Sequence, residues 1–237
     1  MAFESTWSFL PHSPIEKLES NLWRVEAAIP RNPIKRVMTV VRREDGGLVI
    51  HSAIALDDRS MTELEQFGTP AYLVVPNAFH RIDALRYKTR YPALRVVAPR
   101  GSAKKVSDCV KVDLAYNEYI GDNALTMQHA RGTKEREGVL TVRSSGGTSL
   151  VFNDIVFNMP HVGGFGGWVL KNVTQSSGGP KCSRIAKMFL IDNKDEMAAH
   201  FEAFAKEPQL KRAIVSHHET ILDPANALVS LASSLRA

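Results

Sequence analysis

Apolar residues follow two patterns along the chain, and the first indicates an α/β arrangement. Ala71-Tyr-Leu-Val-Val75 and Arg95-Val-Val-Ala98 suit strands that are buried on both faces. Helical spacing precedes each of them, and predicts a helix from a cap at Ser60 to Phe67 and another over residues 82–90. The order helix, strand, helix, strand predicts a parallel or mixed sheet with helices packed on it.

The second pattern consists of short segments joined by turns, which predicts antiparallel strands. Leu22–Ala28 and Arg36–Arg42 suit two strands, and Pro30 and Pro33 are expected to break the connection between them. Asp45-Gly46-Gly47 then predicts a hairpin turn into a third strand. The chain is therefore expected to open with an antiparallel unit.

The second half of the chain combines both patterns. Residues 110–156 alternate in short segments and are predicted to be mostly β. Residues 163–180 are rich in Gly and Ser, which favours a loop or a partly helical excursion. Residues 196–206 and 224–235 have the spacing of amphipathic helices, and Arg212–Ser216 is predicted as a strand between them.

Length and composition favour one ordinary globular domain. The chain has 237 residues, of which 44% are hydrophobic and 23% charged, so neither disorder nor a fibrous architecture is indicated. No internal repeat or linker divides it. We expect a single domain over residues 1–237, with residues 1–20 as an N-terminal extension.

The net charge of +5 favours anionic partners only weakly, because the basic residues are scattered. No dense run of aromatic and basic residues marks a nucleic-acid face, so nucleic acid is not the expected partner. We expect a small molecule, of anionic character, as substrate or ligand. The oligomeric state is left open.

The number and spacing of the cysteines, and the hydropathy of the chain, indicate in which cellular compartment the protein is expected. Cys109 and Cys182 are far apart and form no CxxC pair, which disfavours a disulfide framework and a thiolate zinc site. The first residues do not resemble a secretory signal, and no stretch approaches the roughly 20 apolar residues of a membrane helix. We therefore expect a cytoplasmic protein without a membrane partner.

The first candidate for chemistry is the loop Pro76-Asn-Ala-Phe-His-Arg-Ile-Asp83, directly after a predicted strand. Loops at the carboxyl ends of strands collect ligands and catalytic groups in α/β sheets. His80 could bind a metal or move a proton. The alternative is that Asn77 and His80 only cap the following helix.

Asp154 and His217 also follow predicted strands. A carboxylate at the end of an apolar strand is costly unless it is solvated, paired or coordinated, so Asp154 is a candidate ligand, with a simple turn residue as the alternative. His217 and His218 are adjacent, and side chains next to each other on a strand point to opposite faces, so at most one enters a common site. His217 is preferred. His129 and His161 are expected to be structural.

The layout around this loop resembles the metallo-β-lactamase superfamily, in which an HxHxDH motif supplies metal ligands. In this chain Asn77, Phe79, Arg81 and Ile82 stand at the motif positions, so the motif itself is lost. His51-Ser-Ala53, the loop from Pro76 and Ser216-His-His218 resemble, in order and spacing, the HSP-like, PNxxHH-like and SHG-like segments of a poorly characterised family of that superfamily. The resemblance covers about residues 22–235.

The resemblance implies an αββα sandwich, with two mixed sheets face to face, helices outside, and a site at one edge. It also implies that Asp154 and His217 match superfamily ligands. We therefore expect a metal-dependent hydrolase with Asn77, His80 and Asp154 as catalytic residues, and with one divalent ion, zinc or iron, held by His80, Asp154 and His217. The alternative is a member without metal or catalysis that binds a small anionic ligand or a protein partner. Nucleic-acid processing is a third hypothesis, which rests on charge and on phosphodiesterase branches alone.

Overall fold

The computed structural model describes residues 3–29 and 32–237, and their strands form three sheets. The first has seven strands in the order β1 to β7, the second has four in the order β13-β10-β9-β8, and the third pairs β11 with β12. The strands of the first sheet are β1 (Glu16–Glu19), β2 (Leu22–Ile29), β3 (Asn32–Arg42), β4 (Gly47–His51), β5 (Thr69–Val74), β6 (Arg95–Ala98) and β7 (Leu114–Ala115). The others are β8 (Leu125–His129), β9 (Gly138–Ser144), β10 (Gly147–Phe152), β11 (Phe157–Met159), β12 (Gly179–Lys181) and β13 (Leu210–Val215).

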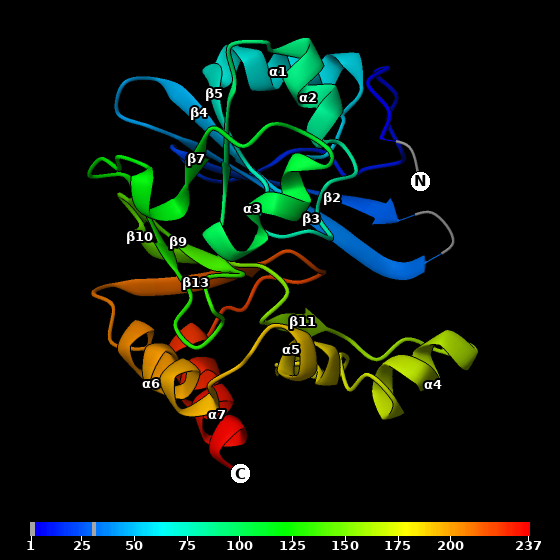
Figure 1. Ribbon diagram of the computed structural model, residues 1–237, viewed down its shortest axis with the longest axis vertical. Helices are drawn as coiled ribbons and strands as arrows, with labels where there is room; N and C mark the ends of the chain where they lie inside the picture. Colours follow the sequence, from blue (N-terminus) through cyan, green and yellow to red (C-terminus); the bar gives the residue numbers. More distant parts are fainter. Residues whose placement is uncertain (1–2, 30–31) are drawn as a thin grey trace.

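Most of the helices flank the two large sheets on their outer sides, whereas the helix α4 (Gly164–Asn172) lies on an arm that projects from the body of the molecule (Figure 1). The other helices are α1 (Asp58–Phe67), α2 (Ala84–Arg90), α3 (Arg100–Ser107), α5 (Arg184–Phe189), α6 (Lys194–Phe204) and α7 (Pro224–Arg236), with a 3-10 turn at Tyr116–Glu118. None of the helices in the described residues is long and apolar enough to cross a bilayer.

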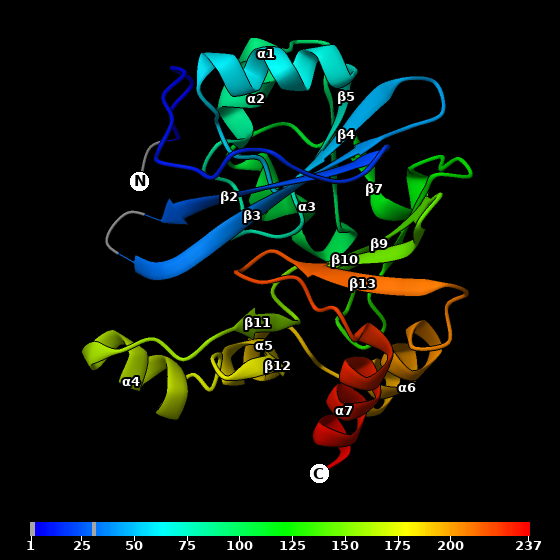
Figure 2. The ribbon, with the colours of Figure 1, turned by 180° about the vertical axis from the view of Figure 1, so that it is seen from behind.

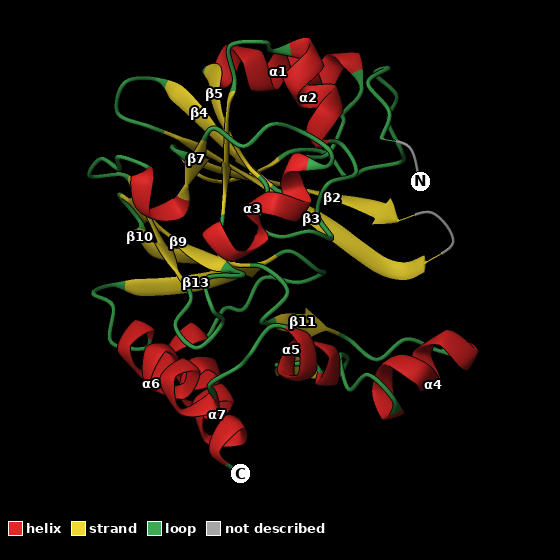
Figure 3. Ribbon diagram, in the orientation of Figure 1, coloured by secondary structure: helices red, strands yellow, loops and turns green. Residues whose placement is uncertain are grey.

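Three clusters of buried apolar side chains fill the spaces between the helices and the sheets and between the two large sheets. The outer face of the first sheet packs on helices α1 to α3, with Leu64 and Tyr87 among the buried contacts. Residues such as Val49, Val151 and Ile214 fill the space between the two sheets. A third cluster joins the second sheet to α5, α6 and α7. The view from behind (Figure 2) and the view coloured by secondary structure (Figure 3) show the same four layers, so the expected αββα sandwich of two mixed sheets is confirmed.

Strand directions within the sheets explain where a site can form. β1 to β4 are antiparallel neighbours, and β4 to β7 are parallel. In the second sheet, β10 pairs with β13 in parallel and with β9 antiparallel. Parallel strands end at the same edge, so the loops after β4, β5, β10 and β13 can supply neighbouring side chains.

Several predicted boundaries differ from the structure. Asp57, and not Ser60, caps α1, because the Asp57 side chain accepts a hydrogen bond from the backbone N–H of Ser60, which lies inside the helix. Pro33 lies within β3 near its start, where a missing N–H is tolerated. Pro30 lies outside the described residues. The expected N-terminal extension contributes β1. The glycine-rich stretch after residue 163 contains α4, which agrees with the expected partly helical excursion.

Candidate functional site

Asp154 and His217 lie side by side because two parallel strands end together. Phe152 of β10 is opposite Val215 of β13 in the register of the second sheet. Asp154 and His217 each follow two positions later along their own segments. The register therefore brings both to the same edge of the sheet.

His80 reaches this edge from the other sheet, in the loop after β5. The Oδ1 atom of Asn77 accepts a hydrogen bond of 2.7 Å from the backbone N–H of Phe79, which closes a local turn. His80 Nδ1 lies 2.7 Å from Ser52 Oγ. Ser52 follows β4 and has a φ of 56°, a left-handed conformation that is uncommon for a residue with a Cβ atom. Backbone strain of this kind clusters at functional sites.

The three side chains converge on one carboxylate oxygen. Oδ1 of Asp154 lies 3.1 Å from His80 Nε2 and 2.8 Å from His217 Nε2. One ligand atom from each residue lies within 4.8 Å of the other two. The three ligands expected from the sequence thus lie together, although 74 and 63 positions separate Asp154 from these histidines.

A hydrogen bond at the second ring nitrogen of His217, Nδ1, fixes which tautomer its neutral imidazole adopts. Nδ1 lies 2.9 Å from the backbone carbonyl oxygen of Lys35, which can only accept a hydrogen bond, so Nδ1 carries a proton. In a neutral ring, Nε2 then carries the lone pair that could bind a metal ion, whereas the 2.8 Å hydrogen bond to the carboxylate of Asp154 needs a proton on Nε2. The ring of Phe157 stacks on the imidazole at a centroid distance of 4.9 Å and limits its rotation.

The charges at the site favour an ionised Asp154. Burial alone would raise the pKa of this carboxyl, but the charge of His80 and the hydrogen bonds with His217 and His80 outweigh it and hold the pKa well below its usual range. The other carboxylate oxygen, Oδ2, accepts a hydrogen bond of 2.6 Å from the side-chain amide of Asn77. Asn77 is only 1% exposed and lies beneath the site.

Glu137, which no sequence pattern singled out, lies below Asn77 and is fully buried. Its Oε1 accepts hydrogen bonds from the amides of Asn77, at 2.5 Å, and Asn153, at 3.0 Å. Burial and the negative charge of Asp154 raise the pKa of Glu137 well above its usual value. Glu137 is therefore neutral while Asp154 is ionised, so the two carboxyl groups do not repel each other, and the side-chain amide of Asn77 donates a hydrogen bond to both. The sequence feature that could have indicated Glu137 is its place directly before the apolar strand that starts at Gly138.

His51, which belongs to the HSP-like segment but was given no role from the sequence, is a second buried group near the site. It is fully buried at the end of β4, and neither ring nitrogen has a hydrogen-bond partner among the described residues. Burial, helped by the charge of His80, lowers its pKa to about 3. His51 is therefore neutral at physiological pH.

The remaining histidines lie outside the group. His218 turns away, with Nε2 accepting a hydrogen bond from the backbone N–H of Lys35. His129 Nε2 accepts from the N–H of Arg100, and His161 Nδ1 contacts the hydroxyl of Ser177.

The architecture is similar to that of several solved metallo-β-lactamases. DIM-1 metallo-β-lactamase exposed to ceftazidime matches with a TM-score of 0.63 at 13% identity, over 96% of this chain and 99% of that one. The metallo-β-lactamase from Pontibacter korlensis matches with a TM-score of 0.59 at 12% identity, over 92% and 98%. FIM-1 from Pseudomonas aeruginosa, in its mono-zinc form, matches with a TM-score of 0.61 at 11% identity, over 95% and 96%. The chain has the metallo-β-lactamase fold.

Sequence comparison adds nothing finer to this result. No protein-family model and no curated protein matches the sequence. The resemblance to a poorly characterised family with a PNxxHH-like loop therefore stays a prediction, whereas the metallo-β-lactamase fold is established by the structure.

The donor set in this metallo-β-lactamase fold fits a divalent metal ion. Two imidazoles and one carboxylate suit zinc and also iron. The Nε2 atom of His217 is left free by the proton on Nδ1, and the contact between Lys35 and His217 is the kind of outer hydrogen bond that orients metal-binding histidines. His80, Asp154 and His217 can thus hold one ion.

Two pockets meet at these residues. One, of about 290 Å³, contains the three candidate ligands together with Arg36, Ser52 and Phe79. The other, of about 260 Å³, shares Phe79 and Asp154 but is mainly apolar, with walls from α4 and α5. The group of His80, Asp154 and His217 thus lies where the two pockets adjoin.

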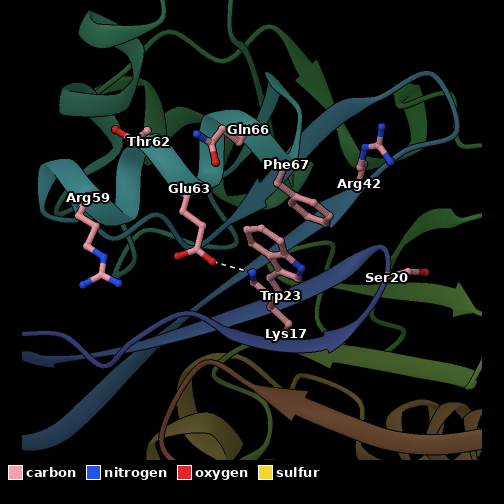
Figure 4. Close-up of a pocket in the computed structure, with 9 residues that line it drawn as sticks. All are labelled: Lys17, Ser20, Trp23, Arg42, Arg59, Thr62, Glu63, Gln66 and Phe67. Atoms are coloured by element: carbon pink, nitrogen blue, oxygen red, sulfur yellow. Dashed lines mark ion pairs between the residues drawn. The ribbon is translucent and has the colours of Figure 1, made fainter.

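A wider hollow than these two pockets lies elsewhere, beside α1 (Figure 4). It measures about 900 Å³, and in it Trp23 stacks on Phe67 at 3.7 Å while Lys17 pairs with Glu63 at 2.7 Å. None of its nine lining residues is a histidine, cysteine or aspartate. Its size alone does not make it the reactive site.

Proposed function

We propose that the protein is a hydrolase that depends on one divalent metal ion held by His80, Asp154 and His217. The supporting observation is the convergence of two imidazole nitrogens on one carboxylate oxygen, at 3.1 and 2.8 Å, in the wall of a pocket. Three protein ligands leave coordination positions open for water and substrate. A bound ion of this kind supplies a water of lowered pKa and polarises a carbonyl or phosphoryl group.

The surrounding residues keep the three ligands in place. The carbonyl of Lys35 orients His217, Ser52 contacts the outer nitrogen of His80, and the amide of Asn77 holds Oδ2 of Asp154. Asn77, expected from the sequence to be catalytic, is on this proposal a positioning residue, because it is buried beneath the site. His80 and Asp154 line the pocket and can meet a substrate.

Zinc is the first ion to test. FIM-1, one of the similar structures, is described as a mono-zinc form. Iron is the second, since two histidines and one carboxylate also suit ferrous iron. The proposed substrate is a small molecule with a hydrolysable carbonyl or phosphoryl bond.

Metal analysis of protein purified without chelator tests the proposal. We expect about one ion per chain in the wild type, and loss of that ion in the double variant Asp154→Ala, His217→Ala. His161→Ala removes an exposed histidine outside the group and should keep the ion, so it is the matched control. Equal metal content in the double variant and the wild type would place any ion elsewhere and defeat the proposal.

A metal-free binding protein is the second candidate, and Arg36 favours it. Arg36 lines the pocket, its guanidinium lies 2.6 Å from Asp83, and its buried Nε atom has no hydrogen-bond partner among the described residues. This group could bind an anion. If the wild type is folded but holds no metal, isothermal titration with a small dicarboxylate such as succinate should show binding that Arg36→Met abolishes.

A further inference from the structure

The segment from Ile155 to Ile191 has an unusual charge. It contains Lys171, Lys181, Arg184 and Lys187 but no aspartate or glutamate. The whole chain carries 30 basic and 25 acidic residues, so this segment, which includes α4 and α5, holds much of the net positive charge. It presents a locally cationic surface.

The same segment exposes large apolar side chains. On α4, Phe165 is 82% exposed and Trp168 is 56% exposed, and their rings stack at a centroid distance of 6.2 Å. On α5, Met188 is 72% exposed and Phe189 is 58% exposed. A surface helix normally turns polar residues to the solvent. α4 instead buries Leu170 on one side and presents aromatic residues on the other.

The position of α4 makes this surface accessible. Figures 1 and 2 show α4 at the end of an arm that projects from the body of the molecule, on the same side as α5. A flat surface can therefore reach the arm without first meeting the rest of the fold. Ile185 and Phe189 of α5 also line the apolar pocket beside Asp154, so the exposed residues continue into the pocket wall.

We propose that the α4–α5 segment docks the protein onto a lipid bilayer with anionic headgroups. Aromatic rings with flanking lysines and arginines are the features of helices that lie in the membrane interface. Cations near such a surface are attracted to its negative potential. A second copy of the chain is a poorer occupant, because a symmetric contact would bring the four positive charges of each copy together. This docking needs no membrane-spanning helix.

Vesicle sedimentation tests this inference. The wild type should bind vesicles of phosphatidylcholine with about a quarter phosphatidylglycerol, and should bind pure phosphatidylcholine far less. Phe165→Ser with Trp168→Ser should weaken binding about tenfold or more. The double variant Lys171→Ser, Arg184→Ser should weaken vesicle binding at low salt by about fivefold for each lost charge, and so by about thirtyfold in total. Ile120→Ser is the matched apolar control, since Ile120 is 82% exposed but lies outside the segment.

Tryptophan emission gives an independent readout. Trp168 is the strongly exposed tryptophan, whereas Trp7 and Trp23 are at least partly covered. Its emission should therefore shift to shorter wavelength when anionic vesicles are added. Absence of both the shift and sedimentation would overturn the inference, as would equal binding by wild type and Phe165→Ser, Trp168→Ser. A concentration-dependent dimer that disappears in this variant, without vesicle binding, would assign the surface to self-association instead.

The vesicle experiment does not require a metal ion. A failure of docking is therefore distinguishable from a failure of the hydrolase proposal, which metal analysis tests. The expectation from sequence that the protein has no membrane partner predicts the opposite result, so the same experiment decides between the two.

Discussion

His51 lies at the end of β4, where the fold removes an imidazole from water without giving it a partner. Both ring nitrogens are buried, and no described residue offers either of them a hydrogen bond. A charged imidazole would be costly in this place. The folded protein therefore holds His51 neutral, which makes stability depend on pH.

Replacement of His51 should reduce the loss of stability in mild acid. The pKa of His51 is about 3 in the folded chain against an ordinary 6.5, so between these values the unfolded chain binds a proton that the folded chain does not. The free energy of unfolding consequently falls as pH falls through that window. Between pH 7 and pH 5, His51→Gln should lose about 2 kcal/mol less than wild type. Urea unfolding at several pH values measures this, with His161→Gln as control, and identical pH slopes for wild type and His51→Gln would contradict it.

Replacement of Asn77 should lower both the stability of the fold and its affinity for metal. Its amide separates the carboxyl groups of Glu137 and Asp154, and Asn77→Ala leaves both without that donor. We expect a loss of about 2–4 kcal/mol in the free energy of unfolding. Metal affinity, measured by titration with zinc, should fall about 10- to 100-fold. Asn123→Ala changes an exposed asparagine and should alter neither quantity, and an unchanged zinc affinity in Asn77→Ala would refute the positioning role.

Sequence reasoning found some of these residues and missed others for a physical reason. His80, Asp154 and His217 each follow an apolar strand, where a polar side chain is conspicuous. Glu137 does not stand out, because a glutamate in a polar loop looks solvated. His51 was noticed only within the HSP-like segment, which gives it no role by itself. Their importance comes from burial, which depends on how the two sheets pack.

At the scale of elements, long apolar runs predicted strands well, and the predicted ends of two helices, at Phe67 and Arg90, match the structure, whereas the capping residue at the start of α1 was predicted wrongly. β6 matches its predicted range, Arg95–Ala98, because a buried strand needs apolar residues throughout. The helices α3 and α5 were not predicted, since each is short and has few buried residues. The start of α1 was misplaced because Asp57 and Ser60 are both good capping residues by type.

The cap of α1 gives a direct test of that difference. The Asp57 side chain accepts the N–H of Ser60 at 2.7 Å, which satisfies one of the free donors of the first turn. Asp57→Ala should therefore lower the free energy of unfolding by about 1 kcal/mol. Ser60→Ala, three positions later, should stay within about 0.5 kcal/mol of wild type. Urea denaturation of both variants provides the comparison, and a larger effect at Ser60 would restore it as the cap.

At the scale of the whole molecule, the four-layer architecture and the meeting of its halves at His80, Asp154 and His217 were expected from the family resemblance, and not from local sequence patterns. Alternation of strands and helices indicated mixed sheets, whereas nothing local to the sequence says that the loop after β5 meets the ends of β10 and β13. That meeting depends on sheet register and on links between the sheets, such as the 2.8 Å hydrogen bond from the N–H of Val37 to the carbonyl of Ser216. The site is therefore a product of tertiary packing.

A ligand that joins the two halves should stabilise the whole fold. His80 comes from the first sheet, and Asp154 and His217 come from the second, so an ion bound by all three binds only the folded chain. At a free zinc concentration of about 100 times the dissociation constant, the free energy of unfolding should rise by about 2.7 kcal/mol. Thermal unfolding with and without zinc measures the gain, which should vanish in His80→Ala and persist in His161→Ala. Since His80 is the single candidate ligand from the first sheet, an equal gain in His80→Ala would mean that zinc stabilises the protein without bridging its sheets.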